Sequence, residues 1–283
     1  MKDLKISSGV RYMLFAVFVF SLMKVFVKTL SHLPVIEIIL FRAIISLFIS
    51  LFFLIRQKVP VFGKNKPLLL GRGITGAIAL TLNFYLIQQI PLATVSTLTY
   101  LAPVFSTLIG IFLVKERVKH IQWLFFAISF AGILVIQGFD ARISTIHLVM
   151  GITTSLFMGL AYNFVRRLNT TEHPLVIIFY FPLVLLPIAS VWTYYVWIPP
   201  VGMDWFYLLM VGLSTQIAQF FMTKAYQQSE ISTVSILNYL GIVFSLALGF
   251  YFFDETFNLM TYLGMGMVLA GVVLNVVLKT LRN

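Results

Sequence analysis

The sequence predicts an all-α membrane protein in which ten transmembrane helices form two inverted five-helix repeats. Three observations lead to this fold class. Of the 283 residues, 60% are hydrophobic and only 10% are charged, and the mean hydropathy is +1.00. A chain of this composition carries more apolar surface than one soluble core can bury. The apolar residues also fall into segments of membrane-spanning length, and the chain repeats itself at an offset of 139 residues.

Ten apolar segments have the roughly 20 residues that a membrane-spanning helix needs. Lys24 and Lys28 interrupt the first of them, and no small-residue cleavage site follows it, so we interpret it as a helix rather than a signal peptide. Short polar turns separate the segments and leave no room for a soluble domain. The spans lie at roughly 10–30, 34–55, 67–89, 93–114, 120–138, 146–166, 174–196, 204–226, 232–253 and 259–280.

The internal repeat is clearest where residues 94–116 return as residues 233–255. The ungapped offset of 139 residues carries the third to fifth spans onto the eighth to tenth. We therefore predict two domains, 1–139 and 140–283. Because each holds an odd number of helices, the second copy enters the membrane in the opposite direction. Inverted repeats of this kind are typical of transporters that open alternately to the two sides.

The net charge of +11 follows membrane topology rather than a nucleic-acid-binding face. If the N-terminus is cytoplasmic, the positive-inside rule is satisfied, and only Lys28 and Arg142 lie on the outer side. We expect an integral protein of a bacterial inner (cytoplasmic) membrane with both termini in the cytoplasm. The sequence has no cysteine, which excludes disulfides and thiolate metal sites.

Several segments resemble the EamA-type branch of the drug/metabolite transporter superfamily. They are FSLMKVFVKTL followed by EIILFRAIISL, Leu101-Ala102-Pro103-Val104-Phe105, Lys115-Glu116, and the Ala-Gly pairs of the fifth and tenth spans. The resemblance covers essentially the whole chain and is nearly silent about substrate. It implies two inverted five-helix repeats around a central cavity, lined mainly by the first, third, fourth, sixth, eighth and ninth spans.

Two positions follow the pattern of that family and two depart from it. Lys28 and Arg42 match positions that are usually basic. In the second repeat Ile242 replaces the counterpart of Pro103, and Lys24 stands where the family more often has an uncharged residue.

Lys24 is the sharpest candidate for substrate binding. An ionised side chain within a span costs roughly 2.5–3.5 kcal/mol on insertion scales and usually faces water or a partner. Its counterpart in the second repeat is Asn163. We expect Lys24 to attract a carboxylate or phosphate. The alternatives are an ion pair with Glu37, or a side chain that reaches the outer surface beside Lys28.

Arg42 and Glu37 also lie within a span. Arg42 is more readily explained as a brace between helices, with substrate binding as the alternative. Glu37 could neutralise Lys28, Arg42 or both, or it could carry a coupled proton.

Three further residues are candidates for gating. Glu116 and Glu255 are repeat counterparts near the ends of their helices, where gate or helix-end roles fit better than proton transfer. Pro103 removes a backbone hydrogen bond within the fourth span and is a candidate hinge.

Neutral polar side chains lie within the spans that the resemblance assigns to the cavity. Each could bind substrate or only join neighbouring helices. Together they favour a polar cavity, in which the aromatic rings would suit planar or cationic groups. These residues are Asn83, Tyr85, Tyr100, Asn163, Gln216, Gln219, Asn238 and Tyr239.

Small residues recur at a spacing of four in the fifth and tenth spans. They are Ala127 and Ala131, with counterparts Gly266 and Ala270. This spacing predicts close helix packing and also permits a homodimer.

We predict a secondary transporter that moves a small polar metabolite, an amino acid or another carboxylate-bearing compound, by alternating access. A larger cationic metabolite such as S-adenosylmethionine is the alternative, and Lys24 disfavours it. An intramembrane enzyme is not supported, because the HExxH and GxSxG motifs are absent and the four histidines sit near helix ends. We expect no cofactor, metal or nucleic acid as a partner. An ion channel would require a symmetric assembly with a ring of charges or carbonyls, and the internal inverted repeat favours a carrier instead.

Overall fold

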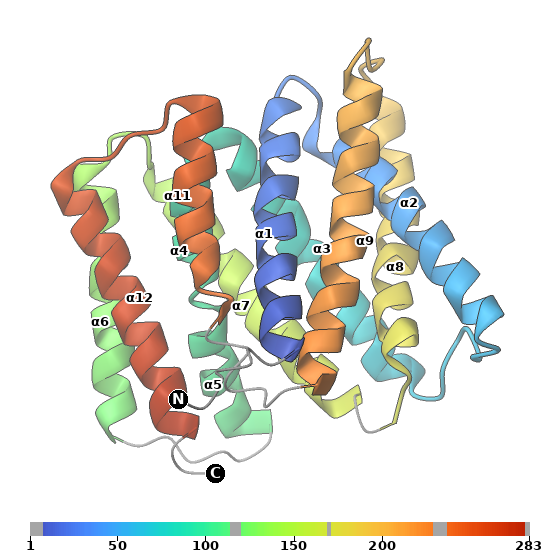
Figure 1. Cartoon of the computed structure of the whole chain (residues 1–283), viewed down its shortest axis with the longest axis horizontal. Coiled ribbons are helices and arrows are strands. Elements are labelled where there is room, and N and C mark those ends of the chain that lie inside the picture. The colour runs from blue at the N-terminus through green and yellow to red at the C-terminus, as the bar shows by residue number, and fades with distance from the viewer. Residues whose placement is uncertain (1–7, 114–119, 169–170, 229–236, 281–283) are drawn as a thin grey trace, which may run out of the picture.

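The computed structural model describes residues 8–113, 120–168, 171–228 and 237–280, and within these ranges every regular element is a helix (Figure 1). The helices are α1 (Ser8–Thr29), α2 (Val35–Arg56), α3 (Lys66–Gln89), α4 (Leu92–Thr99), α5 (Ala102–Leu113), α6 (His120–Phe139), α7 (Thr145–Leu168), α8 (Pro174–Val196), α9 (Asp204–Gln228), α11 (Leu240–Phe253) and α12 (Leu259–Thr280).

The predicted all-helical membrane fold is confirmed. Eight helical segments are long and apolar enough to cross a bilayer, and α4 and α5 together supply one of them, Leu92–Ile111. Two shorter apolar helices, Leu240–Phe253 and Leu259–Leu274, account for the remaining two spans. The chain therefore crosses the membrane ten times, in two inverted sets of five helices.

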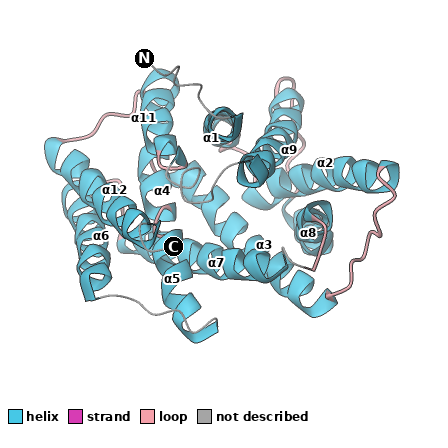
Figure 2. Ribbon diagram, turned by 60° about the horizontal axis from the view of Figure 1, so that its bottom comes forward, coloured by secondary structure: helices cyan, strands magenta, loops and turns pink. Residues whose placement is uncertain are grey.

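The helices of the two halves pack against each other rather than within separate halves. α1 packs on α9, α2 on α8, α3 on α7, and α6 on α12. The pairs α2–α8 and α6–α12 lie at opposite ends of the molecule, with α1, α4 and α11 between them (Figures 1 and 2). We call the side where α1 begins and α12 ends the termini face, and the other side the opposite face.

Both halves have a turn at nearly corresponding residues, shifted by one position in the repeat. The break between α4 and α5 falls at Tyr100 and Leu101, and Asn238 and Tyr239 form the turn that precedes α11. At the break in the first half Leu101 N donates to the carbonyl of Leu98 at 3.2 Å, an i→i−3 bond that tightens the chain. Discontinuous helices of this kind are common near the substrate sites of transporters.

Pro103 does not kink the interior of a helix. It is the second residue of α5, where a missing N–H costs no helical hydrogen bond. The second half has Ile242, the third residue of α11, at the corresponding place, and a turn at Asn238 and Tyr239 precedes it. Proline is therefore not required for the break.

The packing of α6 on α12 uses other small residues than those predicted. A Cβ atom placed on Gly264 would lie 2.7 Å from the carbonyl oxygen of Gly132, and one on Gly132 would lie 2.6 Å from that of Gly264. Gly266 and Ala270 are exposed, and a Cβ on Gly266 would meet nothing within 4 Å. The predicted close-packing role of Gly266 is wrong, because it borders an open groove between α12 and Ile128 of α6 rather than touching the neighbouring helix.

Candidate functional site

Lys24 lies where helices of the two halves meet. Its Nζ donates to Ser96 Oγ of α4 at 2.6 Å, and that oxygen is 2.7 Å from Ser245 Oγ of α11. Both serines are completely buried. The ion pair that the sequence offered as an alternative, with Glu37, is absent from the described residues, where Lys24 pairs with no carboxylate. Lys24 is therefore linked to the second half of the protein through two hydroxyl groups.

Tyr100, four residues after Ser96, meets its repeat counterpart Tyr239. Their ring centroids are 5.2 Å apart and the rings are nearly perpendicular, at 87°. Tyr100 Oη also donates to the backbone carbonyl of Asn238 at 2.5 Å. A Cβ on Gly241 would lie 2.1 Å from the Tyr100 hydroxyl, so this position accepts only glycine without a shift. The break between α4 and α5 thus touches the turn before α11, where the two halves meet.

Two of the predicted polar residues join helices. Asn163 Nδ2 donates to the carbonyl oxygen of Ser106 at 3.0 Å, which joins α7 to α5. Gln216 Nε2 donates to Ser50 Oγ at 3.1 Å, which joins α9 to α2. In both cases the amide has a protein partner and serves helix packing in this conformation.

The remaining three predicted polar residues belong to α3 and α9. Asn83 of α3 is half-buried, and Gln219 of α9 is half-buried as well. Tyr85 keeps 39% of its surface exposed.

Arg42 is buried, with 5% of its surface exposed, and Arg72 lies near it. Arg42 Nε donates to Thr215 Oγ1 at 3.1 Å, and its guanidinium lies 5.0 Å from the ring centroid of Phe181. Arg72 lies 5.6 Å from the same ring. A desolvated cation–π contact contributes about 2 kcal/mol, which is less than the several kcal/mol that burying an ion costs. The ring alone does not compensate the two charges.

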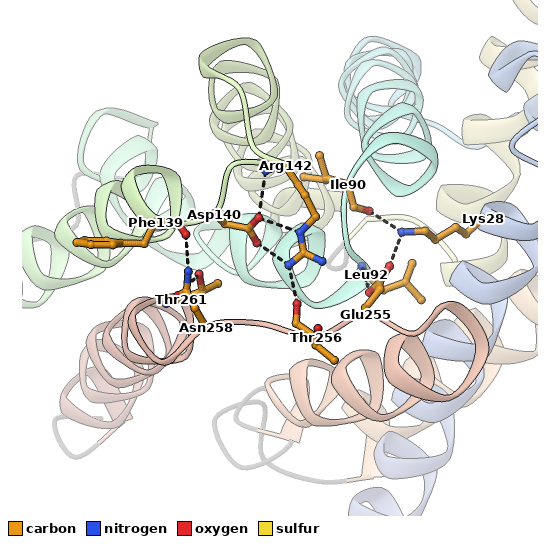
Figure 3. A network of polar contacts seen from close by, with 10 residues as sticks. All are labelled: Lys28, Ile90, Leu92, Phe139, Asp140, Arg142, Glu255, Thr256, Asn258 and Thr261. Carbon is orange, nitrogen blue, oxygen red and sulfur yellow. Dashed lines mark hydrogen bonds and ion pairs between the residues drawn. The ribbon is translucent and has the colours of Figure 1, made fainter.

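The opposite face is closed by contacts between the two halves (Figure 3). Lys28 Nζ of α1 forms an ion pair with Glu255, which follows α11, and donates to the carbonyl of Ile90 at 2.9 Å. The other carboxylate oxygen of Glu255 accepts from Leu92 N at 2.8 Å, at the N-terminus of α4, where the helix dipole favours a negative charge. The two halves are therefore tied together at this face.

A second ion pair lies in the loop between α6 and α7 (Figure 3). Arg142 Nη2 lies 2.8 Å from Asp140 Oδ2 and donates to the carbonyl of Thr256 at 2.8 Å. Asn258 Nδ2 reaches the carbonyl of Phe139 at 2.5 Å. These contacts tie the loop after α6 to the loop before α12.

The contribution of the Asp140 carboxylate to the stability of the folded protein should depend on pH only at acidic pH. Burial alone would raise the pKa of its carboxyl, but the side-chain and backbone hydrogen bonds from Arg142, together with its charge, lower the pKa below its ordinary value of 3.8. Because the carboxyl has a lower pKa in the folded than in the unfolded protein, it stabilises the folded state above about pH 4. This stabilisation is lost as the pH falls through the lowered pKa. The melting-temperature difference between wild type and Asp140→Asn should be constant from pH 8 to pH 5 and shrink below pH 4. A difference that disappears between pH 8 and pH 6 would contradict this assignment.

The other gating candidates have separate places. Glu37 is completely buried; its Oε2 accepts from Ile198 N at 3.2 Å, and its Oε1 has no hydrogen-bond partner among the described residues. It forms an ion pair with neither Lys28 nor Arg42 in the described part of the chain. Glu116 lies outside the described residues.

Comparison with known proteins decides the family. The profile of the EamA-like transporter family matches residues 7–138 and again residues 145–277. The chain belongs to the EamA-like transporter family. The resemblance inferred from the sequence is confirmed, and the two matches of this EamA-like protein fall one in each half.

Relatives of this EamA-like protein are transporters. The pseudopaline exporter CntI of Pseudomonas aeruginosa is 31% identical over 92% of this chain and 92% of its own length. Human solute carrier family 35 member G1 is 25% identical over 95% of this chain and 78% of its own length. The S-adenosylmethionine uptake transporter of Rickettsia conorii is 20% identical over 77% of this chain and 75% of its own length.

A solved structure shares the fold. It superimposes with a TM-score of 0.70 over 98% of this chain and 99% of that chain, at 16% sequence identity. Together with the family match, these relatives identify the EamA-like protein as an integral membrane transporter of a small-molecule substrate. The family and the relatives bear the names of transporters rather than of enzymes.

Proposed function

We propose that this EamA-like protein is a secondary transporter of a small carboxylate-bearing metabolite. The observation that carries the substrate class is the Lys24 side chain, which donates to Ser96 between the halves and has no carboxylate partner among the described residues. A charge inside a span is a functional site by default. A carboxylate on the substrate would give it the missing counter-ion.

Alternating access supplies the mechanism in this proposal. The two units are 1–139 and 140–283, and the termini face is the cytoplasmic one by the positive-inside rule. Exposure of the substrate to the outside then requires that Lys28 and Glu255 separate. The contact between the break at Tyr100 and the turn at Tyr239 is where the two units would move against each other.

Replacing Lys24 by methionine should weaken transport of the substrate roughly tenfold or more. A hydrogen bond to a charged group contributes about 1.5–3 kcal/mol, and 1.4 kcal/mol is a factor of ten. A thermal-shift screen of purified protein against carboxylate metabolites identifies the ligand, because binding stabilises the folded state. Uptake of that ligand into proteoliposomes then compares wild type with Lys24→Met.

Lys64→Met is the matched control, because this exposed lysine lies in the loop between α2 and α3. It changes the net charge equally and should leave transport unchanged. Equal uptake kinetics for Lys24→Met and wild type would remove Lys24 from the site.

A cationic metabolite is the second candidate. The paired rings of Tyr100 and Tyr239 would suit a cation, and one relative is an S-adenosylmethionine uptake transporter. This candidate predicts that S-adenosylmethionine stabilises the purified protein and that Lys24→Met strengthens its binding. The 31% identical relative is an exporter, so efflux is the direction to measure first.

A further inference from the structure

Two arginines from different helices converge on one aromatic ring inside the bundle. The guanidinium carbons of Arg42 and Arg72 lie 5.0 and 5.6 Å from the ring centroid of Phe181. Arg42 is seven residues into α2 and Arg72 is six residues into α3, from opposite faces. At 1.5 Å per residue both lie about 10 Å inside their helix ends. The pair therefore sits within the membrane-spanning part of the protein.

The donors of these two side chains are largely unused. Arg42 Nη1, Arg72 Nε and Arg72 Nη1 are buried and have no hydrogen-bond partner. Neither arginine belongs to an ion pair within the described ranges. Arg42 uses Nε for Thr215, and no other hydrogen bond of either guanidinium is described.

This arrangement is costly unless an anion visits it. Buried donors without acceptors and like charges facing each other are both unfavourable in a medium of low dielectric constant. The face of Phe181 attracts a cation but offers no oxygen to an N–H group. Intramembrane charges that are kept at such a cost usually mark the path or site of a substrate.

We propose that Arg42 and Arg72 form an oxyanion-binding subsite, which takes a carboxylate or phosphate group of the transported molecule. The planar guanidinium matches the geometry of such oxygens and binds them through two parallel N–H groups. Phe181 contacts both guanidiniums, and the ring of Phe84 also lies 5.6 Å from the guanidinium of Arg42; neither ring offers an acceptor to the unpaired nitrogens. This inference rests on the proposed function for the identity of the ligand as a substrate.

The subsite is connected to the region of Lys24. Thr215 Oγ1, which accepts from Arg42, also lies 3.0 Å from Met23 Sδ, and Met23 is the residue before Lys24 on α1. The residue next to Lys24 on α1 therefore contacts the same threonine as Arg42. A substrate with more than one anionic group would engage both Lys24 and the arginines, so the structure favours a di- or tri-anionic metabolite over one with a single carboxylate.

Gly76 makes room for the Arg72 head group. A Cβ atom at Gly76 would lie 2.2 Å from Arg72 Nη1 and 2.7 Å from Phe181 Cδ2. Gly76→Ala therefore displaces the guanidinium without removing its charge. It provides a second variant that tests position rather than charge.

The test is anion binding to the purified full-length protein in detergent. Melting temperature is measured against citrate, inorganic phosphate and, for non-specific salt effects, sodium chloride at equal ionic strength. Citrate or phosphate should stabilise wild type beyond sodium chloride, and the anion that does so tells carboxylate from phosphate chemistry. Arg72→Gln should raise the apparent Kd roughly tenfold or more, and Arg72→Lys and Gly76→Ala should lie between.

Arg56→Gln is the control of equal charge change, since Arg56 is exposed at the end of α2; it should bind as wild type does. The inference is overturned if neither anion stabilises wild type, or if Arg72→Gln, or Arg72→Lys and Gly76→Ala where Arg72→Gln does not fold, binds with unchanged affinity. If Lys24→Met loses anion binding while the variants at Arg72 and Gly76 keep it, the arginine subsite is overturned and the proposed function is retained. Arginine-dependent binding without transport in vesicles would instead contradict the proposed function and keep the subsite.

Discussion

Cross-linking position 28 to position 255 in a Lys28→Cys/Glu255→Cys variant should stop transport completely. The Lys28 ammonium and the Glu255 carboxylate are in contact at the opposite face, so a short bifunctional methanethiosulfonate can join thiols placed there. A covalent bridge between α1 and the end of α11 prevents this face from opening, and a carrier that cannot open one face completes no cycle. Transport in proteoliposomes should fall to background and return when a reducing agent cleaves the bridge.

The absence of cysteine from the chain makes this experiment free of background labelling. Each single-cysteine variant, treated with the same reagent, should keep its transport. An Asp140→Cys/Arg142→Cys pair is the matched control, because both positions lie in one loop and its bridge joins no two moving parts. Transport at the untreated rate by fully cross-linked Lys28→Cys/Glu255→Cys protein would rule out alternating access through this face.

The sequence was sufficient for the fold because the bilayer allows few solutions. A span needs about 20 apolar residues and satisfies its own backbone hydrogen bonds, so hydropathy locates the helices. The offset of 139 residues then relates the two halves. Both signals are strong in this chain, and neither requires knowledge of how the side chains pack.

The partners of individual charges were less predictable. Lys28 has Glu37 nearby in sequence, yet its carboxylate partner is Glu255, which is 227 residues away. Proximity in the sequence pointed to Glu37 as the partner of Lys28. The actual partner is determined by the packing of the two halves, which brings distant loops together at the opposite face. Glu255 itself was identified as a gate or helix-end residue from its place in the repeat, and its contact with Leu92 N agrees with a helix-end position.

The residues that surround the candidate sites were missed for chemical reasons. Ser96 and Ser245 resemble many serines in membrane helices, which commonly bond their own backbone, as Ser96 does to the carbonyl of Leu92 at 2.9 Å. From the sequence, Arg72 fits the positive-inside rule as a cytoplasmic residue, because it lies near the start of its span. The feature that could have identified Arg72 as an intramembrane residue is its position inside α3 rather than in the loop before this helix.

Replacing Gly264 by alanine should destabilise the protein, whereas the same change at Gly266 should not. The added methyl at Gly264 would lie 2.7 Å from the backbone oxygen of Gly132, and backbone does not yield as a flexible side chain does. The helices must separate, at a cost of about 1–3 kcal/mol for overpacking. At Gly266 the methyl enters open space, and alanine gains up to about 1 kcal/mol of helix propensity over glycine.

Each of the two variants adds one methyl group to the same helix, at positions two residues apart. Effects of composition and expression therefore cancel when the two are compared. The expected result is a lower melting temperature in detergent for Gly264→Ala and an equal or higher one for Gly266→Ala. Gly132→Ala, on the other side of the contact, should behave as Gly264→Ala does. Equal melting temperatures for Gly264→Ala and Gly266→Ala would mean that α6 and α12 do not touch through Gly132 and Gly264. The close-packed face of α12 would then have to be sought elsewhere, beginning with the Gly266 and Ala270 spacing that the sequence first suggested.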